Sequence, residues 1–166
     1  MRYAKLMKND IVDTDEGIVV SVWLQGCPFR CKGCHNPETW DFNGGIEIEK
    51  STLINNTLDS LCANGIKRNL SILGGEPLCD QNIEFTELLI WSVKQSLPDT
   101  KIYLWTGFEY MRLTHNIKYQ YILDNVDIII TGPFIQEQRN ITLKLRGSEN
   151  QEIWRRDKTG ILMLET

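Results

Sequence analysis

The sequence of 166 residues predicts an α/β fold, a partial (β/α) barrel with mostly parallel strands. Apolar runs of strand length alternate with segments in which apolar residues recur at helical spacing, a pattern typical of parallel sheets. Turns that contain glycine or cysteine follow these runs. The chain also falls short of the about 250 residues of a complete eight-unit barrel. We therefore expect a single domain over residues 1–166 that forms only part of a barrel.

The expected elements follow from local residue patterns. Short runs rich in β-branched or apolar residues predict strands at 18–24, 70–73, 101–105 and 126–130. Apolar residues at helical spacing predict helices at 53–62, 85–93 and 110–123. Asn64-Gly65 marks the end of the first helix, and Pro98 limits the second. Two later segments are weaker candidates for short strands, 141–145 and 161–164.

Four turns follow the expected parallel strands directly. They contain the cysteine-rich stretch 27–34, Gly74-Gly75, Thr106-Gly107 and Thr131-Gly132. Ligands bind beyond the carboxyl ends of parallel strands, because the loops that follow the strands meet there. The sequence therefore predicts one binding site, on the rim to which these four turns contribute.

The composition is that of an ordinary globular chain, with 42% hydrophobic and 24% charged residues and a formal net charge of -4. The negative charge argues against nucleic acid as a partner, because phosphate binding usually needs a basic face. No segment has the about 18 apolar residues of a membrane span, and residues 1–10 lack the apolar core of a signal peptide. We expect a cytoplasmic protein whose five cysteines are reduced thiols.

Three of the cysteines, Cys27, Cys31 and Cys34, lie close together in the spacing C-x3-C-x2-C. A [4Fe–4S] cluster usually takes four thiolate ligands, and three cysteines in one short loop can hold three of its corners. The neighbouring sequence offers no fourth cysteine. One iron would then stay open to a small molecule.

Other interpretations of these cysteines remain open. A zinc site could use the three cysteines and His35, although structural zinc sites usually pair ligands from two separated knuckles. Covalent c-type haem would fit the stretch Cys31–His35 but would leave Cys27 unexplained. The cysteines could also be core residues, since free cysteine is often buried. A structural role is the interpretation we favour for Cys62, on the apolar stripe of a helix, and for Cys79.

Two later motifs are ambiguous when taken alone. Gly74-Gly75-Glu76-Pro77 follows a strand, so its backbone could approach a ligand closely or could form a plain turn. The polar stretch Leu145–Gln151 could be a solvated turn. Alternatively, its Arg146 could bind a carboxylate or phosphate through its forked donors.

Taken together, the cysteine spacing at 27–34 and the motif Gly74–Pro77 resemble the radical S-adenosylmethionine (SAM) superfamily. Four further segments are similar to its activators of anaerobic ribonucleoside-triphosphate reductases: 34–45, 105–107, 132–134 and 146–151. The resemblance covers about residues 10–151 and implies the radical SAM type of partial barrel. One departure is Thr131, which stands where the family commonly has aspartate.

The resemblance implies roles for individual residues. Cys27, Cys31 and Cys34 would bind a [4Fe–4S] cluster. The residues that would hold SAM are Gly33, Cys34, His35, Gly74, Gly75 and Glu76. Beyond the cluster and the SAM site, no residue would act as a catalytic acid or base.

The function implied by the resemblance is glycyl-radical formation on the large subunit of an anaerobic (class III) ribonucleoside-triphosphate reductase. An electron from a flavodoxin- or ferredoxin-like donor would drive cleavage of SAM to a 5′-deoxyadenosyl radical, which would take a hydrogen from a glycine. Two alternatives remain open. The protein could activate another glycyl-radical enzyme such as pyruvate formate-lyase, or it could be a non-enzymatic metal-binding module. Neither nucleic acid nor a membrane is an expected partner.

Overall fold

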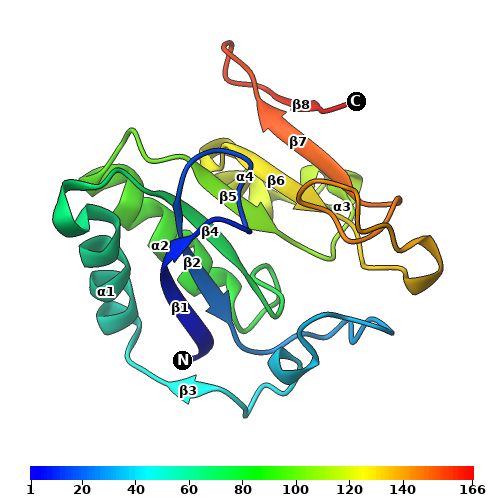
Figure 1. The fold of residues 1–166 in the computed structure, drawn as a ribbon, viewed down its shortest axis with the longest axis horizontal. Coiled ribbons are helices and arrows are strands. Elements are labelled where there is room, and N and C mark those ends of the chain that lie inside the picture. Colours follow the sequence, from blue (N-terminus) through cyan, green and yellow to red (C-terminus); the bar gives the residue numbers. More distant parts are fainter.

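The computed structural model describes all of residues 1–166, and its eight strands form one mixed sheet in the order β3-β1-β2-β4-β5-β6-β7-β8. The strands are β1 (Arg2–Asp10), β2 (Val19–Leu24), β3 (Ile46–Glu47), β4 (Asn69–Gly74), β5 (Ile102–Trp105), β6 (Ile128–Thr131), β7 (Glu152–Arg156) and β8 (Leu162–Leu164). Figure 1 shows the two edge strands, β3 and β8, at opposite ends of the molecule.

The prediction of a partial (β/α) barrel with mostly parallel strands is wrong. Only β2, β4, β5 and β6 run parallel to one another, while β1, β3, β7 and β8 pair antiparallel. A parallel pair needs a long crossover, usually a helix, whereas antiparallel neighbours need only a loop. Loops without an α-helix join β1 to β2 and β6 to β7. These two connections therefore reverse the chain, and the outer strands turn the parallel centre into an open mixed sheet.

The helices lie in the connections between the parallel strands. They are α1 (Lys50–Cys62), α2 (Ile83–Ser96), α3 (Tyr110–Thr114) and α4 (Gln120–Asn125), with short 3₁₀ turns η1 (Pro37–Thr39), η2 (Ala63–Gly65), η3 (Ile117–Tyr119) and η4 (Gln136–Gln138). The helices expected at 53–62 and 85–93 are confirmed. The segment 110–123 is broken, because Asn116 accepts a hydrogen bond from the backbone N–H of Lys118 and starts a new turn. None of the helices combines the length and apolar character that crossing a membrane requires.

The main core lies between the helices and one face of the sheet. Alternate residues of β2 (Val20, Val22 and Leu24) are completely buried there, together with apolar residues of α1, α2 and α4. Nearly every residue of β2 and β4 is buried, as expected for central strands covered on both faces. The expected strand at 141–145 is absent. Leu145 has a positive φ of 59°, which a β-strand does not accommodate.

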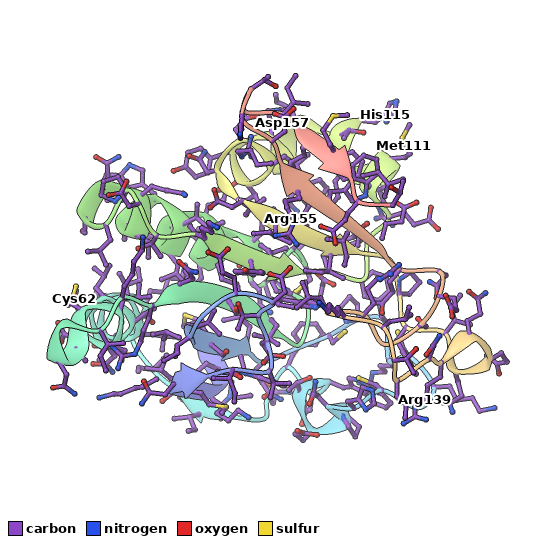
Figure 2. The ribbon with its side chains drawn as sticks, turned by 45° about the horizontal axis from the view of Figure 1, so that its top comes forward. Cys62, Met111, His115, Arg139, Arg155 and Asp157 are labelled. Carbon is purple, nitrogen blue, oxygen red and sulfur yellow. The ribbon has the colours of Figure 1, made fainter.

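Residues 11–18, between β1 and β2, cover the other face of the sheet. Asp15 accepts a hydrogen bond of 2.8 Å from the Tyr103 hydroxyl on β5 and one of 2.6 Å from Arg155 on β7, which is labelled in Figure 2. Burial acts to raise the pKa of Asp15, but the two hydrogen bonds and the charge of Arg155 outweigh it. The pKa of Asp15 therefore lies below its usual value. The loop is therefore attached to β5 and β7 by an ionised carboxylate.

Replacing Tyr103 by phenylalanine is expected to loosen this loop. The variant loses one hydrogen bond to a charged acceptor, which costs about 1.5–3 kcal/mol in the free energy of unfolding. Because the folded-state pKa of Asp15 is lowered, the bond contributes above the unfolded-state pKa of about 4 and is lost as the pH falls. Urea denaturation should therefore show a difference from wild type at pH 7 that shrinks at acidic pH. A pH-independent difference would contradict the role of Asp15.

Candidate functional site

A cavity of about 700 Å³ lies at the carboxyl ends of the parallel strands. Its lining includes Cys27, Cys31, Cys34, His35, Leu73, Gly74, Gly75, Glu76, Trp105, Thr106, Gly107 and Gly132. The cysteine loop follows β2, the glycine motif follows β4, Thr106-Gly107 follows β5 and Gly132 follows β6. The prediction that these turns meet on one rim is confirmed.

The cysteine loop is folded by its own backbone. The N–H of Gly26 donates to Thr39 O at 2.8 Å, and the N–H of Cys27 donates to Trp40 O at 3.2 Å, so both ends of the loop are joined. Inside it, the N–H of Cys34 donates to Cys31 O, and Gly33 has a φ of 75° that favours glycine. Gly33 faces the side chain of Gln136 and lies outside the cavity lining. The loop therefore directs its three thiols into one space.

The donor set fits an iron–sulfur cluster. No three cysteine, histidine or carboxylate side chains converge closely enough to hold a single metal ion, as a zinc site would require. A [4Fe–4S] cluster places each thiolate on a different iron, so its ligands are spread around the cluster. Burial raises the pKa of Cys27 to about 11 and that of Cys31 above its usual value. Metal binding must therefore displace protons from these thiols.

Gly74 and Gly75 pack directly on the beginning of the cysteine loop. The N–H of Gly75 donates to Leu24 O at 2.8 Å, and the N–H of Glu76 donates to Gly26 O at 2.8 Å. A methyl group on Gly75 would overlap the carbonyl of Gly26, and one on Gly74 would overlap the backbone of Leu24. Glycine is therefore required here so that the two loops can touch, whatever ligand the cavity holds.

Glu76 is almost completely buried and joins two strand ends. Its carboxylate accepts hydrogen bonds from Leu78 N–H at 2.9 Å, from the Thr106 hydroxyl at 2.8 Å and from Gly107 N–H at 2.7 Å. Burial raises the pKa of Glu76 to about 7, although the three donors act in the opposite direction. Both carboxylate oxygens are thus occupied by the protein, and the side chain shapes the cavity wall.

Comparison with known proteins assigns the chain to a family. Residues 14–154 match the family described as a 4Fe-4S single cluster domain. Three relatives are each named anaerobic ribonucleoside-triphosphate reductase-activating protein. They come from Haemophilus influenzae (34% identical, 93% of this chain and 98% of the relative), Enterobacteria phage T4 (34%, 93% and 94%) and Escherichia coli K12 (30%, 92% and 97%). The chain belongs to this family of reductase-activating proteins.

Some of the site residues predicted from the sequence line the cavity of this family member, and others do not. The three cysteines, His35, Gly74, Gly75 and Glu76 line it. His35 is exposed, and its ring lies 5.7 Å from that of Phe134. Cys79 is buried outside the cavity lining, and Cys62 is exposed at the end of α1, on the far side of the molecule from Arg139 in Figure 2. The structural interpretation of Cys62 as a core residue is therefore wrong, and neither cysteine belongs to the site.

Several lining residues were not predicted as site residues from the sequence. Trp23 and Trp40 line the cavity, and their indole Nε1 groups are buried without a hydrogen-bond partner. Asp13, from the loop that covers the sheet, also lines the cavity, and burial raises its pKa to about 7. Buried polar groups normally find a partner, so the two indoles indicate that a ligand completes this site.

Asn82, at the start of α2, connects the two loops of the site from behind. Its side-chain amide is buried and donates to Gln25 O at 3.0 Å and to Glu76 O at 3.0 Å, with a longer contact of 3.4 Å to Gly26 O. One amide group thus fixes the beginning of the cysteine loop relative to the glycine motif. A residue between a turn and a helix carries no mark of such a role in the sequence.

Replacing Asn82 by alanine should destabilise this protein. The change leaves the carbonyl of Gln25 without a donor and removes one of the donors to Glu76 O, at a cost of about 1–3 kcal/mol in the free energy of unfolding. We also expect less iron to be retained after reconstitution, because the cysteine loop loses its attachment. Asn55→Ala, at an exposed position of α1, is the control and should change stability by less than about 0.5 kcal/mol. Equal effects of the two substitutions would contradict the assignment.

Proposed function

We propose that this family member is a radical SAM enzyme that generates a glycyl radical on an anaerobic ribonucleoside-triphosphate reductase. One observation supports this function above the others. The three cysteines of the C-x3-C-x2-C loop and the glycine motif Gly74–Glu76 line one cavity of about 700 Å³. That space can take a cluster and a small cosubstrate together.

Cys27, Cys31 and Cys34 would hold the cluster and leave one iron free for the amino and carboxylate groups of SAM. With one electron from a flavodoxin- or ferredoxin-like donor, such a cluster would supply reductive cleavage of SAM to methionine and a 5′-deoxyadenosyl radical, and that radical would take a hydrogen atom from a glycine Cα of the reductase. No side chain needs to act as an acid or base in this step.

The protein's own residues position the reactants and limit access of water. Of the residues that the family resemblance assigns to SAM, Cys34, His35, Gly74, Gly75 and Glu76 line the cavity and would surround it, whereas Gly33 lies outside the lining and would shape the cysteine loop. Trp23 and Trp105 form apolar walls of the same cavity, and the loop that contains Asp13 and Asp15 contributes a further wall. Such walls exclude water and stray hydrogen donors from a reactive intermediate.

The proposal is tested by anaerobic reconstitution with iron and sulfide, followed by incubation with SAM and dithionite. Iron and sulfide near four of each per chain, together with methionine and 5′-deoxyadenosine in equal amounts, are expected. The same incubation without dithionite is the control and should give no products. Zinc in place of iron, or a cluster that never cleaves SAM, would support a non-enzymatic metal-binding module instead.

A further inference from the structure

The late motif Arg146–Gln151 packs against the loop that follows β6. Ser148 Oγ accepts a hydrogen bond from Ile135 N–H at 3.2 Å. Asn150 donates to Pro133 O at 2.8 Å, and Gln151 donates to Gly132 O at 3.0 Å. Three of the polar side chains in the motif therefore hold the backbone of one loop against another. The motif is therefore not a solvated turn. The role of its positively charged residue, Arg146, needs a separate explanation.

Arg146 has few partners within the protein. Its Nη1 donates to Gln151 O at 3.1 Å, while its Nε is buried and has no hydrogen-bond partner. None of the ion pairs in the structure includes Arg146. A guanidinium has five N–H donors, so most of its capacity is unused.

The same side chain lines the cavity with the three cysteines. Gly147, the next residue, packs on the ring of Phe134, which lies beside His35. Trp105 donates to Leu145 O at 2.8 Å, so the residue before Arg146 is also attached to the cavity wall. The arginine is thus held at the site from both sides, near the end of the cysteine loop.

None of the carboxylates that line the cavity forms an ion pair with Arg146. Glu76 accepts three hydrogen bonds, and Asp15 is bound to Tyr103 and Arg155. Asp13 lies beside Asp10, another carboxylate. Arg146 therefore lines the cavity with unused donors that an entering anion could occupy.

We propose that Arg146 binds a carboxylate of a reactant in this cavity. This inference rests on the proposed function and adds a recognition residue to it. The guanidinium presents two parallel N–H donors that match a carboxylate, and such charge-assisted pairs are stronger than neutral ones. The carboxylate comes either from SAM or from an acidic side chain of the reductase segment that enters the cavity. A carboxylate has about four lone-pair sites, so one that also binds iron can still accept from arginine.

The test compares Arg146→Gln with Arg146→Lys and with Arg139→Gln, a control at an exposed arginine labelled in Figure 2. Iron content and circular dichroism first establish that each reconstituted protein is folded and loaded. Equilibrium dialysis then measures binding of SAM and of decarboxylated SAM, and electron paramagnetic resonance measures how the radical yield depends on reductase concentration.

If the carboxylate belongs to SAM, Arg146→Gln should weaken SAM binding about tenfold or more and leave binding of decarboxylated SAM unchanged. If it belongs to the reductase, SAM binding should be unchanged while the reductase concentration for half-maximal radical yield rises about tenfold or more. Arg146→Lys should be intermediate in either case, because it keeps the charge and loses the fork. If the glutamine variant does not fold, the lysine variant is judged by the same two measurements.

The inference is overturned if both quantities match wild type, or if SAM and its decarboxylated form weaken equally, which would indicate lost packing. A failure of the proposed function looks different, because the wild-type protein itself would then neither bind nor cleave SAM.

Discussion

Replacing Cys31 by alanine is expected to abolish the iron–sulfur cluster and leave the fold intact. Cys31 is half-buried in a loop at the cavity. It is not one of the residues of the hydrophobic core. With only two thiolates left in the loop, a cluster cannot be held at three corners. Iron per chain after reconstitution should fall to near zero, and the visible absorption of the cluster should disappear.

Cys62→Ala is the matched control, because Cys62 is exposed at the end of α1 and lies outside the cavity. It should retain the full iron content and the visible spectrum. The far-ultraviolet circular dichroism of both variants should match that of wild type. Full retention of iron by Cys31→Ala would show that the cluster ligands have been assigned wrongly.

Replacing Gly75 by alanine is expected to cause a large loss of stability. The new methyl group would overlap the carbonyl of Gly26, which is backbone and cannot rotate away as a side chain could. Movement is opposed by the hydrogen bonds from Gly75 to Leu24 and from Glu76 to Gly26. Overpacking of this kind lowers the free energy of unfolding by about 1–3 kcal/mol. We expect a clash with backbone to cost as much as the upper end of that range or more.

Urea denaturation measures this cost, and iron content after reconstitution shows whether the cysteine loop has moved. Gly160→Ala is the control: Gly160 has a φ of 86° but no neighbouring atoms where the methyl group would lie. Only the backbone strain of about 1–2 kcal/mol applies there, and the cluster should be unaffected. If Gly75→Ala is no more destabilising than Gly160→Ala and binds iron normally, the packing role of Gly75 is contradicted.

The central strands could be predicted from sequence, and the sheet edges could not. β2, β4, β5 and β6 are covered on both faces, so their sequences are continuous apolar runs. β1 and β7 lie toward the edges, and their sequences, such as Glu152–Arg156, mix charged and apolar residues. Periodicity does not detect such strands, and missing them led to the prediction of a mostly parallel barrel.

The parts of the site that could be predicted are those in which the chemistry of the ligand requires particular residues at a particular spacing along the chain. The loop that contains Cys27, Cys31 and Cys34 and the glycine motif both have a recognisable order along the chain. Asn82 depends instead on contacts between distant segments: its side-chain amide donates to carbonyls 56 and 57 residues away in the chain. Only the fold brings these groups together, so their roles follow from the structure.

Electron paramagnetic resonance of the reductase, after anaerobic incubation with the reconstituted protein, SAM and dithionite, tests the central claim most directly. We expect a doublet signal from a glycyl radical on the reductase, which collapses to a singlet when the glycine Cα hydrogen is replaced by deuterium. The signal should be absent with Cys31→Ala. No radical on the reductase despite SAM cleavage, or a radical formed only on pyruvate formate-lyase, would contradict the proposed function.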